Sequence, residues 1–133
     1  MLASGIDSIR LFLHIIGATI WVGGQLTLAA LVPILRAVDP TLPKKAATVF
    51  NKVAWPAYAL LILTGIWNIA TTPAGSSANY NAVLGIKMFV VALSGVAAYL
   101  HTKAKGTVGL AIWGALSGLS ALGATYLGVL LAG

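Results

Sequence analysis

The sequence predicts an all-α integral membrane protein, folded as a four-helix bundle. Of its 133 residues, 59% are hydrophobic and only 8% are charged, whereas a soluble domain carries about 25% charged residues. The charges gather in short polar segments and leave four apolar stretches, each near the roughly 20 residues that a helix needs to cross a bilayer. Four such spans and their turns use up the chain, so we expect a single transmembrane domain over residues 1–133.

The four expected spans are free of acidic residues and comprise residues 11–35, 54–71, 82–102 and 107–132. Pro33 lies near the far end of the first, where a kink or a stop is tolerated. Apolar residues at helical spacing between Ala46 and Val53 predict a short interfacial helix before the second span. Pro56 is then expected in the first turn of that span, where its missing N–H does no harm.

The distribution of basic residues predicts that both termini lie outside. Six of the eight basic residues fall in the first and third connections, namely Arg36, Lys44, Lys45, Lys52, Lys103 and Lys105. The middle connection, residues 72–81, carries no charge. By the positive-inside rule the two basic connections are cytoplasmic. We therefore interpret the net charge of +6 as a topological signal and expect the lipid bilayer, not nucleic acid, as the partner.

Small residues dominate the fourth span, where Gly114 and Gly118 form a G-x-x-x-G pair. Such residues let helices approach closely in lipid, where no hydrophobic force drives helices together. Packing within the bundle is one interpretation, and a homodimer through small-residue helix faces is another. The chain has no cysteine, which excludes disulfides and thiolate metal sites.

Three ionisable residues fall within the spans: His14, Lys87 and His101. Such residues are costly in hydrocarbon unless they are paired or ligated, so they are candidates for function. At 1.5 Å per residue, His14 and Lys87 both lie roughly 6–8 Å below the outer surface. His101 is about 21 Å deeper than Lys87 and belongs to the inner surface. The candidate site is therefore built on His14 and Lys87.

The residues that follow His14 at helical spacing include Gly17, Trp21 and Gln25. Small residues beside a histidine leave space for a flat ligand such as a porphyrin, and Trp21 is placed to pack on its edge. One interpretation is that His14 is a metal ligand that binds haem or copper. The other is that it forms a simple interhelical hydrogen bond. Lys87 would pair with a haem propionate or approach the iron, or else extend to the headgroups.

Four segments of the chain resemble the CopD-like superfamily of bacterial membrane proteins. They are residues 13–24 (LHIIGATIWVGG), 50–56 (FNKVAWP), 63–68 (LTGIWN) and 84–88 (LGIKM). The resemblance covers most of the chain and is most specific at His14 and Lys87. One branch of the superfamily is implicated in copper uptake. The other, the HemJ-type protoporphyrinogen oxidases, binds haem b and depends on a first-helix histidine and a third-helix lysine.

The resemblance to the haem-binding branch implies that His14 is an axial ligand and that Lys87 is a propionate partner or second ligand. Residues 32–36 (VPILR) differ from that branch, which has an aromatic-rich stretch ending in a histidine. The resemblance therefore implies a haem site rather than that specific oxidase activity. The iron would either be open on one side or be shared by two His14 residues across a dimer.

The leading hypothesis is a membrane-embedded b-type haem redox protein of the bacterial cytoplasmic membrane. It would transfer electrons or oxidise a lipophilic substrate such as a porphyrinogen or a quinol, and whether it is an enzyme is left open. The alternatives are a copper-binding or copper-transport protein of the copper-resistance type and a non-catalytic membrane subunit.

Overall fold

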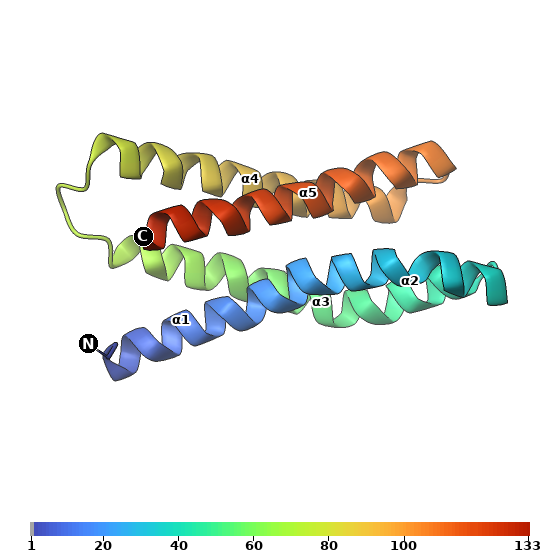
Figure 1. The fold of residues 1–133 in the computed structure, drawn as a ribbon, viewed down its shortest axis with the longest axis horizontal. Helices are drawn as coiled ribbons and strands as arrows, with labels where there is room; N and C mark the ends of the chain where they lie inside the picture. Colours follow the sequence, from blue (N-terminus) through green and yellow to red (C-terminus); the bar gives the residue numbers. More distant parts are fainter. Residues whose placement is uncertain (1) are drawn as a thin grey trace. The chain divides into compact units, whose positions relative to one another are not determined.

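The computed structural model describes residues 2–133, and these residues form helices joined by short connections (Figure 1). Helix α1 (Gly5–Ala18), the π-helical turn η1 (Thr19–Gly23) and helix α2 (Gly24–Val38) follow one another without a break. They are followed by α3 (Leu42–Ala70), α4 (Ala78–Lys103) and α5 (Thr107–Ala132). The described residues thus contain four helical segments that are long and apolar enough to cross a membrane. The all-α, four-helix class is confirmed, and the chain is a multi-pass membrane protein.

The described chain forms two compact units. The first extends to Thr72 and contains α1, η1, α2 and α3; the second begins at Pro73 and contains α4 and α5. In the first unit α3 runs beside α1, η1 and α2, and in the second α4 runs beside α5 (Figure 1). Each unit is a helical hairpin with its own core. The single domain over residues 1–133 and the orientation of the termini stay predictions.

The helix expected before the second span is present, but it is not a separate element. It continues into the span as the single helix α3, because residues 44–55 contain neither glycine nor proline and each added residue extends the hydrogen-bonded ladder. Pro56 therefore lies in the interior of α3, and the prediction that it occupies a first turn is wrong. Its missing N–H leaves the carbonyl of Lys52 without the usual helical donor. Pro33 likewise lies inside α2, which continues to Val38.

Side chains fix the ends of the helices. The hydroxyl of Ser4 accepts the backbone N–H of Asp7 at 3.2 Å, and the hydroxyl of Ser77 accepts that of Tyr80 at 3.1 Å, as N-cap residues do. Between α2 and α3, the Asp39 carboxylate accepts the backbone N–H of Thr41 at 2.7 Å and its hydroxyl at 2.8 Å. These two hydrogen bonds lower the pKa of Asp39 below its ordinary value of 3.8.

Large apolar side chains are exposed along each of the membrane-length helices. Examples that expose about two thirds of their surface are Phe12 on α1, Leu63 on α3, Phe89 on α4 and Leu119 on α5. Soluble monomers rarely expose apolar surface this extensively. These faces are suited to lipid, which explains why few large side chains are buried and why the core consists mainly of alanine and serine.

The α4–α5 hairpin is held by small residues and a reciprocal pair of serines. The hydroxyl of Ser94 donates to the carbonyl of Ser117 at 2.9 Å, and the hydroxyl of Ser117 donates to the carbonyl of Ser94 at 3.0 Å. A Cβ at Gly114 would lie 3.1 Å from the ring of His101, whereas nothing lies within 4 Å of one at Gly118. Gly114 therefore packs within the hairpin, and a homodimer stays a prediction.

Candidate functional site

His14 lies on α1 and faces α3, where it meets Thr64. Its Nδ1 lies 2.7 Å from the Thr64 hydroxyl oxygen. Thr64 is buried, with 3% of its surface exposed, and the His14 ring is half-buried. A Cβ at Gly65 would lie 4.0 Å from Cε1 of His14, so this glycine also adjoins the ring. Thr64 thus forms a polar contact between α1 and α3.

The hydrogen bonds of Thr64 assign the tautomer of His14. The Thr64 hydroxyl oxygen lies 2.7 Å from the carbonyl oxygen of Leu60 and 3.2 Å from that of Leu61. Both carbonyls are acceptors only, and a hydroxyl has one proton to donate. With that proton directed to a carbonyl, the hydroxyl accepts a hydrogen bond from His14, and Nδ1 carries the ring proton. In a neutral imidazole the lone pair then belongs to Nε2.

Gly17 and Trp21 lie on the same face of the first helical segment as His14, as predicted. A Cβ at Gly17 would lie 3.1 Å from the backbone oxygen of Ala57 and 3.1 Å from Cγ of Leu61. The room left by the absent side chain is therefore occupied by α3, and Gly17 allows the two helices to approach each other. A contact between Gly17 and a cofactor stays a prediction.

Trp21 is buried and is the centre of an aromatic cluster. Its ring centroid lies 4.5 Å from that of Tyr58 and 5.4 Å from that of Trp55, and the last two lie 5.8 Å apart. The tilted arrangements are those that aromatic rings favour over a face-to-face stack. Trp21 lies within the π-helical turn, a local widening of the helix that is frequent at functional sites. The cluster packs α1 and η1 against α3 below His14.

The remaining predicted site residues are carried by α2 and α4. Gln25 is half-buried on α2, one turn beyond Trp21. Lys87 lies on α4 in the second unit, where its Nζ would be 3.1 Å from a Cβ at Gly128 of α5. Its side chain therefore packs along α5, and its role toward His14 stays a prediction. His101 is half-buried in the last turn of α4.

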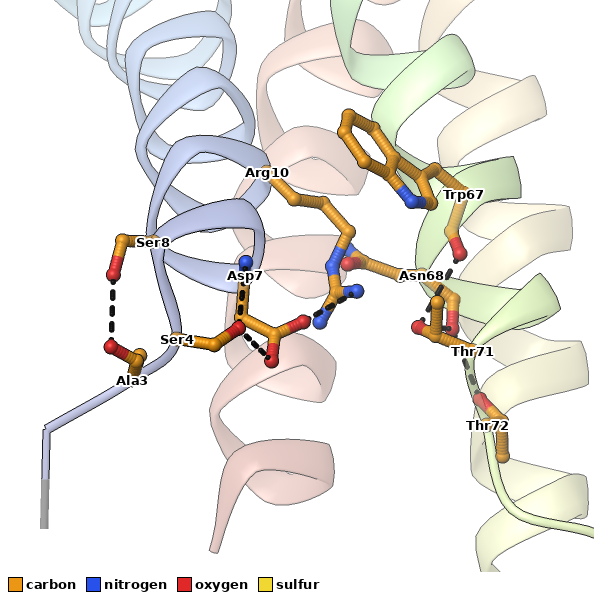
Figure 2. Close-up of polar contacts among 9 residues, drawn as sticks. All are labelled: Ala3, Ser4, Asp7, Ser8, Arg10, Trp67, Asn68, Thr71 and Thr72. Atoms are coloured by element: carbon orange, nitrogen blue, oxygen red, sulfur yellow. Dashed lines mark hydrogen bonds and ion pairs between the residues drawn. The ribbon is translucent and has the colours of Figure 1, made fainter.

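Arg10 is a further candidate, which was not among the predicted site residues. It lies four residues before His14 and therefore on the same side of α1. Its side chain is only 12% exposed, and its Nη1 forms an ion pair with Oδ1 of Asp7 at 2.9 Å. Figure 2 shows the side chain of Asn68, on α3, pointing toward the guanidinium. The spacing of Arg10 and His14 was the signal that could have identified it.

Comparisons with known proteins leave the family undetermined. No family model matches the chain, and no curated protein or solved structure matches it significantly. Membership of the CopD-like superfamily therefore stays a prediction. Among residues 2–133, His, Asp and Glu side chains form no group of three that could hold a metal ion.

Proposed function

We propose that this chain is a membrane-embedded b-type haem redox protein in which His14 is an axial ligand of the iron. The observation that carries the proposal is the position of His14 inside an apolar membrane-length segment, together with the hydrogen bonds through Thr64, which place its ring proton on Nδ1. Metal-ligating histidines commonly donate one ring N–H to a neighbouring acceptor, and this fixes the ring and its tautomer. The residues around His14 thus fit the requirements of a ligand.

Haem is favoured over copper by the number of ligands that the protein must provide. A porphyrin brings the equatorial ligands of its iron, so one histidine is enough to attach it. A copper site made by protein alone needs several ligands from nitrogen- or sulfur-bearing side chains. The chain has two histidines, two methionines and no cysteine, and His14 bonds to the hydroxyl of Thr64.

The side chains of the first unit would bind and orient the cofactor. Thr64 fixes the orientation of the His14 ring, and the aromatic cluster around Trp21 packs η1 against α3. A bound haem b would supply one-electron redox chemistry, either for electron transfer or for oxidation of a lipophilic substrate such as a porphyrinogen or a quinol. The protein would contribute the His14 ligand, its hydrogen bond to Thr64 and an apolar environment, which together would tune the reduction potential. We further propose the bacterial cytoplasmic membrane as its location, with both termini outside.

The absorption spectrum of the purified protein tests the proposal. The full chain would be expressed in cells supplied with a haem precursor, purified in mild detergent and scanned as the wild type, His14→Ala and His101→Ala. We expect a Soret band in the wild type and in His101→Ala, and its loss in His14→Ala. Far-UV circular dichroism would show whether each variant keeps its helices.

Each alternative outcome has a distinct meaning. Retention of the band in folded His14→Ala would exclude this residue as the required ligand. Stoichiometric copper without haem in fully loaded wild-type protein would favour the copper-binding alternative. If the protein purified from haem-replete cells contains neither haem nor copper, the remaining alternative is a non-catalytic membrane subunit.

A further inference from the structure

The guanidinium of Arg10 is only partly hydrogen-bonded. A guanidinium has five N–H donors in a planar fork, and Nη1 of Arg10 pairs with Asp7 at 2.9 Å. Its Nε is buried and has no hydrogen-bond partner among residues 2–133. Leaving a buried donor without an acceptor is unfavourable, and such a group in a native structure calls for an explanation.

Asp7 is not placed to satisfy this second edge of the guanidinium. Its Oδ1 accepts Nη1 of Arg10 and its Oδ2 accepts the hydroxyl of Ser4 at 2.7 Å (Figure 2). The backbone N–H of Asp7 donates to the same hydroxyl at 3.2 Å. The N-cap thus holds the Asp7 carboxylate at one side of Arg10, and the edge that carries Nε requires a different acceptor.

Arg10 and His14 form two successive levels of one interhelical face. They are four residues apart on α1, which places Arg10 one turn and about 6 Å nearer the outer end. Thr64 and Asn68 are also four residues apart on α3, which runs in the opposite direction in the same hairpin. His14 bonds to Thr64, and Asn68 points toward Arg10 (Figure 2). A group bound at one level is therefore close to the other.

We propose that Arg10, assisted by the amide of Asn68, binds a propionate carboxylate of the haem that His14 ligates. This inference rests on the proposed function. A carboxylate offers two oxygens to the planar fork of a guanidinium, and such charge-assisted pairs are the strong hydrogen bonds of proteins. Asp7 orients Arg10 from the other side, and its 46% exposure keeps it hydrated. Haem b has two propionates, so the predicted pairing with Lys87 remains compatible.

A titration with two forms of the cofactor tests this inference. Purified haem-free protein in detergent micelles would be titrated with haem b and with its dimethyl ester, in which both propionates are neutral, and Kd read from the Soret absorbance. Hydrogen bonds to charged groups contribute enough to change affinity by about 10- to 150-fold. We expect Arg10→Gln to weaken binding of haem b by at least about tenfold and to leave binding of the ester unchanged. Arg36→Gln, at the other end of the same continuous helical segment, is the matched control and should change neither.

The outcomes separate the inference from the function on which it rests. Equal binding of haem b by the wild type and Arg10→Gln would overturn the propionate site while haem binding stands. Equal weakening of both forms would also overturn it, since Arg10 would then support only the fold or hold a lipid phosphate. No Soret band with either form in the wild type would remove the proposed function and the inference with it. If Arg10→Gln fails to fold, Arg10→Lys replaces it and should lose part of the preference for the acid form, because lysine lacks the bidentate fork.

Discussion

Removing the hydroxyl that Thr64 presents to His14 should weaken haem binding without changing the shape of the residue. In Thr64→Val a methyl group replaces the hydroxyl oxygen, which now lies 2.7 Å from Nδ1. This hydrogen bond is present without haem, so its loss changes Kd only through its effect on His14 as a ligand. Removing such a hydrogen-bond partner lowers metal affinity by about 10- to 100-fold. Haem titration monitored at the Soret band measures the change.

Two variants show whether the effect comes from this hydrogen bond. Thr64→Ser keeps a hydroxyl and should bind haem about as tightly as the wild type. Thr71→Val removes a hydroxyl from the residue that follows α3, where it donates to the carbonyls of Trp67 and Asn68 at the end of that helix, and should also leave Kd unchanged. The midpoint potential should rise in Thr64→Val, because a histidine that donates to an acceptor is a more basic ligand. Wild-type affinity in Thr64→Val would refute the reasoning.

Two further predictions concern stability, and thermal unfolding in detergent measures both. Ser94→Ala removes one of the two reciprocal hydrogen bonds to Ser117. It should destabilise the α4–α5 hairpin by about 0.6 kcal/mol, the average for such bonds between membrane helices. A change near zero would show that the serines only fill space. Asp39 has a lowered pKa because it accepts two hydrogen bonds from Thr41, so its contribution is present above pH 3.8 and is lost as the pH falls through the lowered value. Asp39→Ala should therefore unfold at a lower temperature than the wild type at pH 5, and the difference should shrink towards pH 2; a difference independent of pH would contradict this.

The sequence was sufficient to predict the four spans because their apolar length is a one-dimensional property. The sequence analysis did not predict that α3 is a single helix, because Pro56 and the preceding lysines suggested a helix boundary. In the structure the helical hydrogen bonding continues from Leu42 past Pro56. The His14–Thr64 contact joins residues 50 positions apart, so it depends on the register of α1 against α3. The sequence identified His14 as a polar residue within a span, but only the packed hairpin pairs it with Thr64. The same register brings Asn68 toward Arg10.

The two histidines show why location, and not hydrogen bonding alone, favours His14 as the ligand. Nδ1 of His101 lies 2.8 Å from the carbonyl oxygen of Leu110, which can only accept, so this ring also carries its proton on Nδ1. His101, however, lies in the last turn of α4 beside the basic connection, where an ionisable residue is less costly than it is inside a span. His14 lies inside an apolar segment, one turn from a partly satisfied arginine, where a polar ring is costly unless it is bonded or ligated. Retention of the Soret band in His101→Ala and its loss in His14→Ala would follow from this difference in environment, since the two rings share the same tautomer.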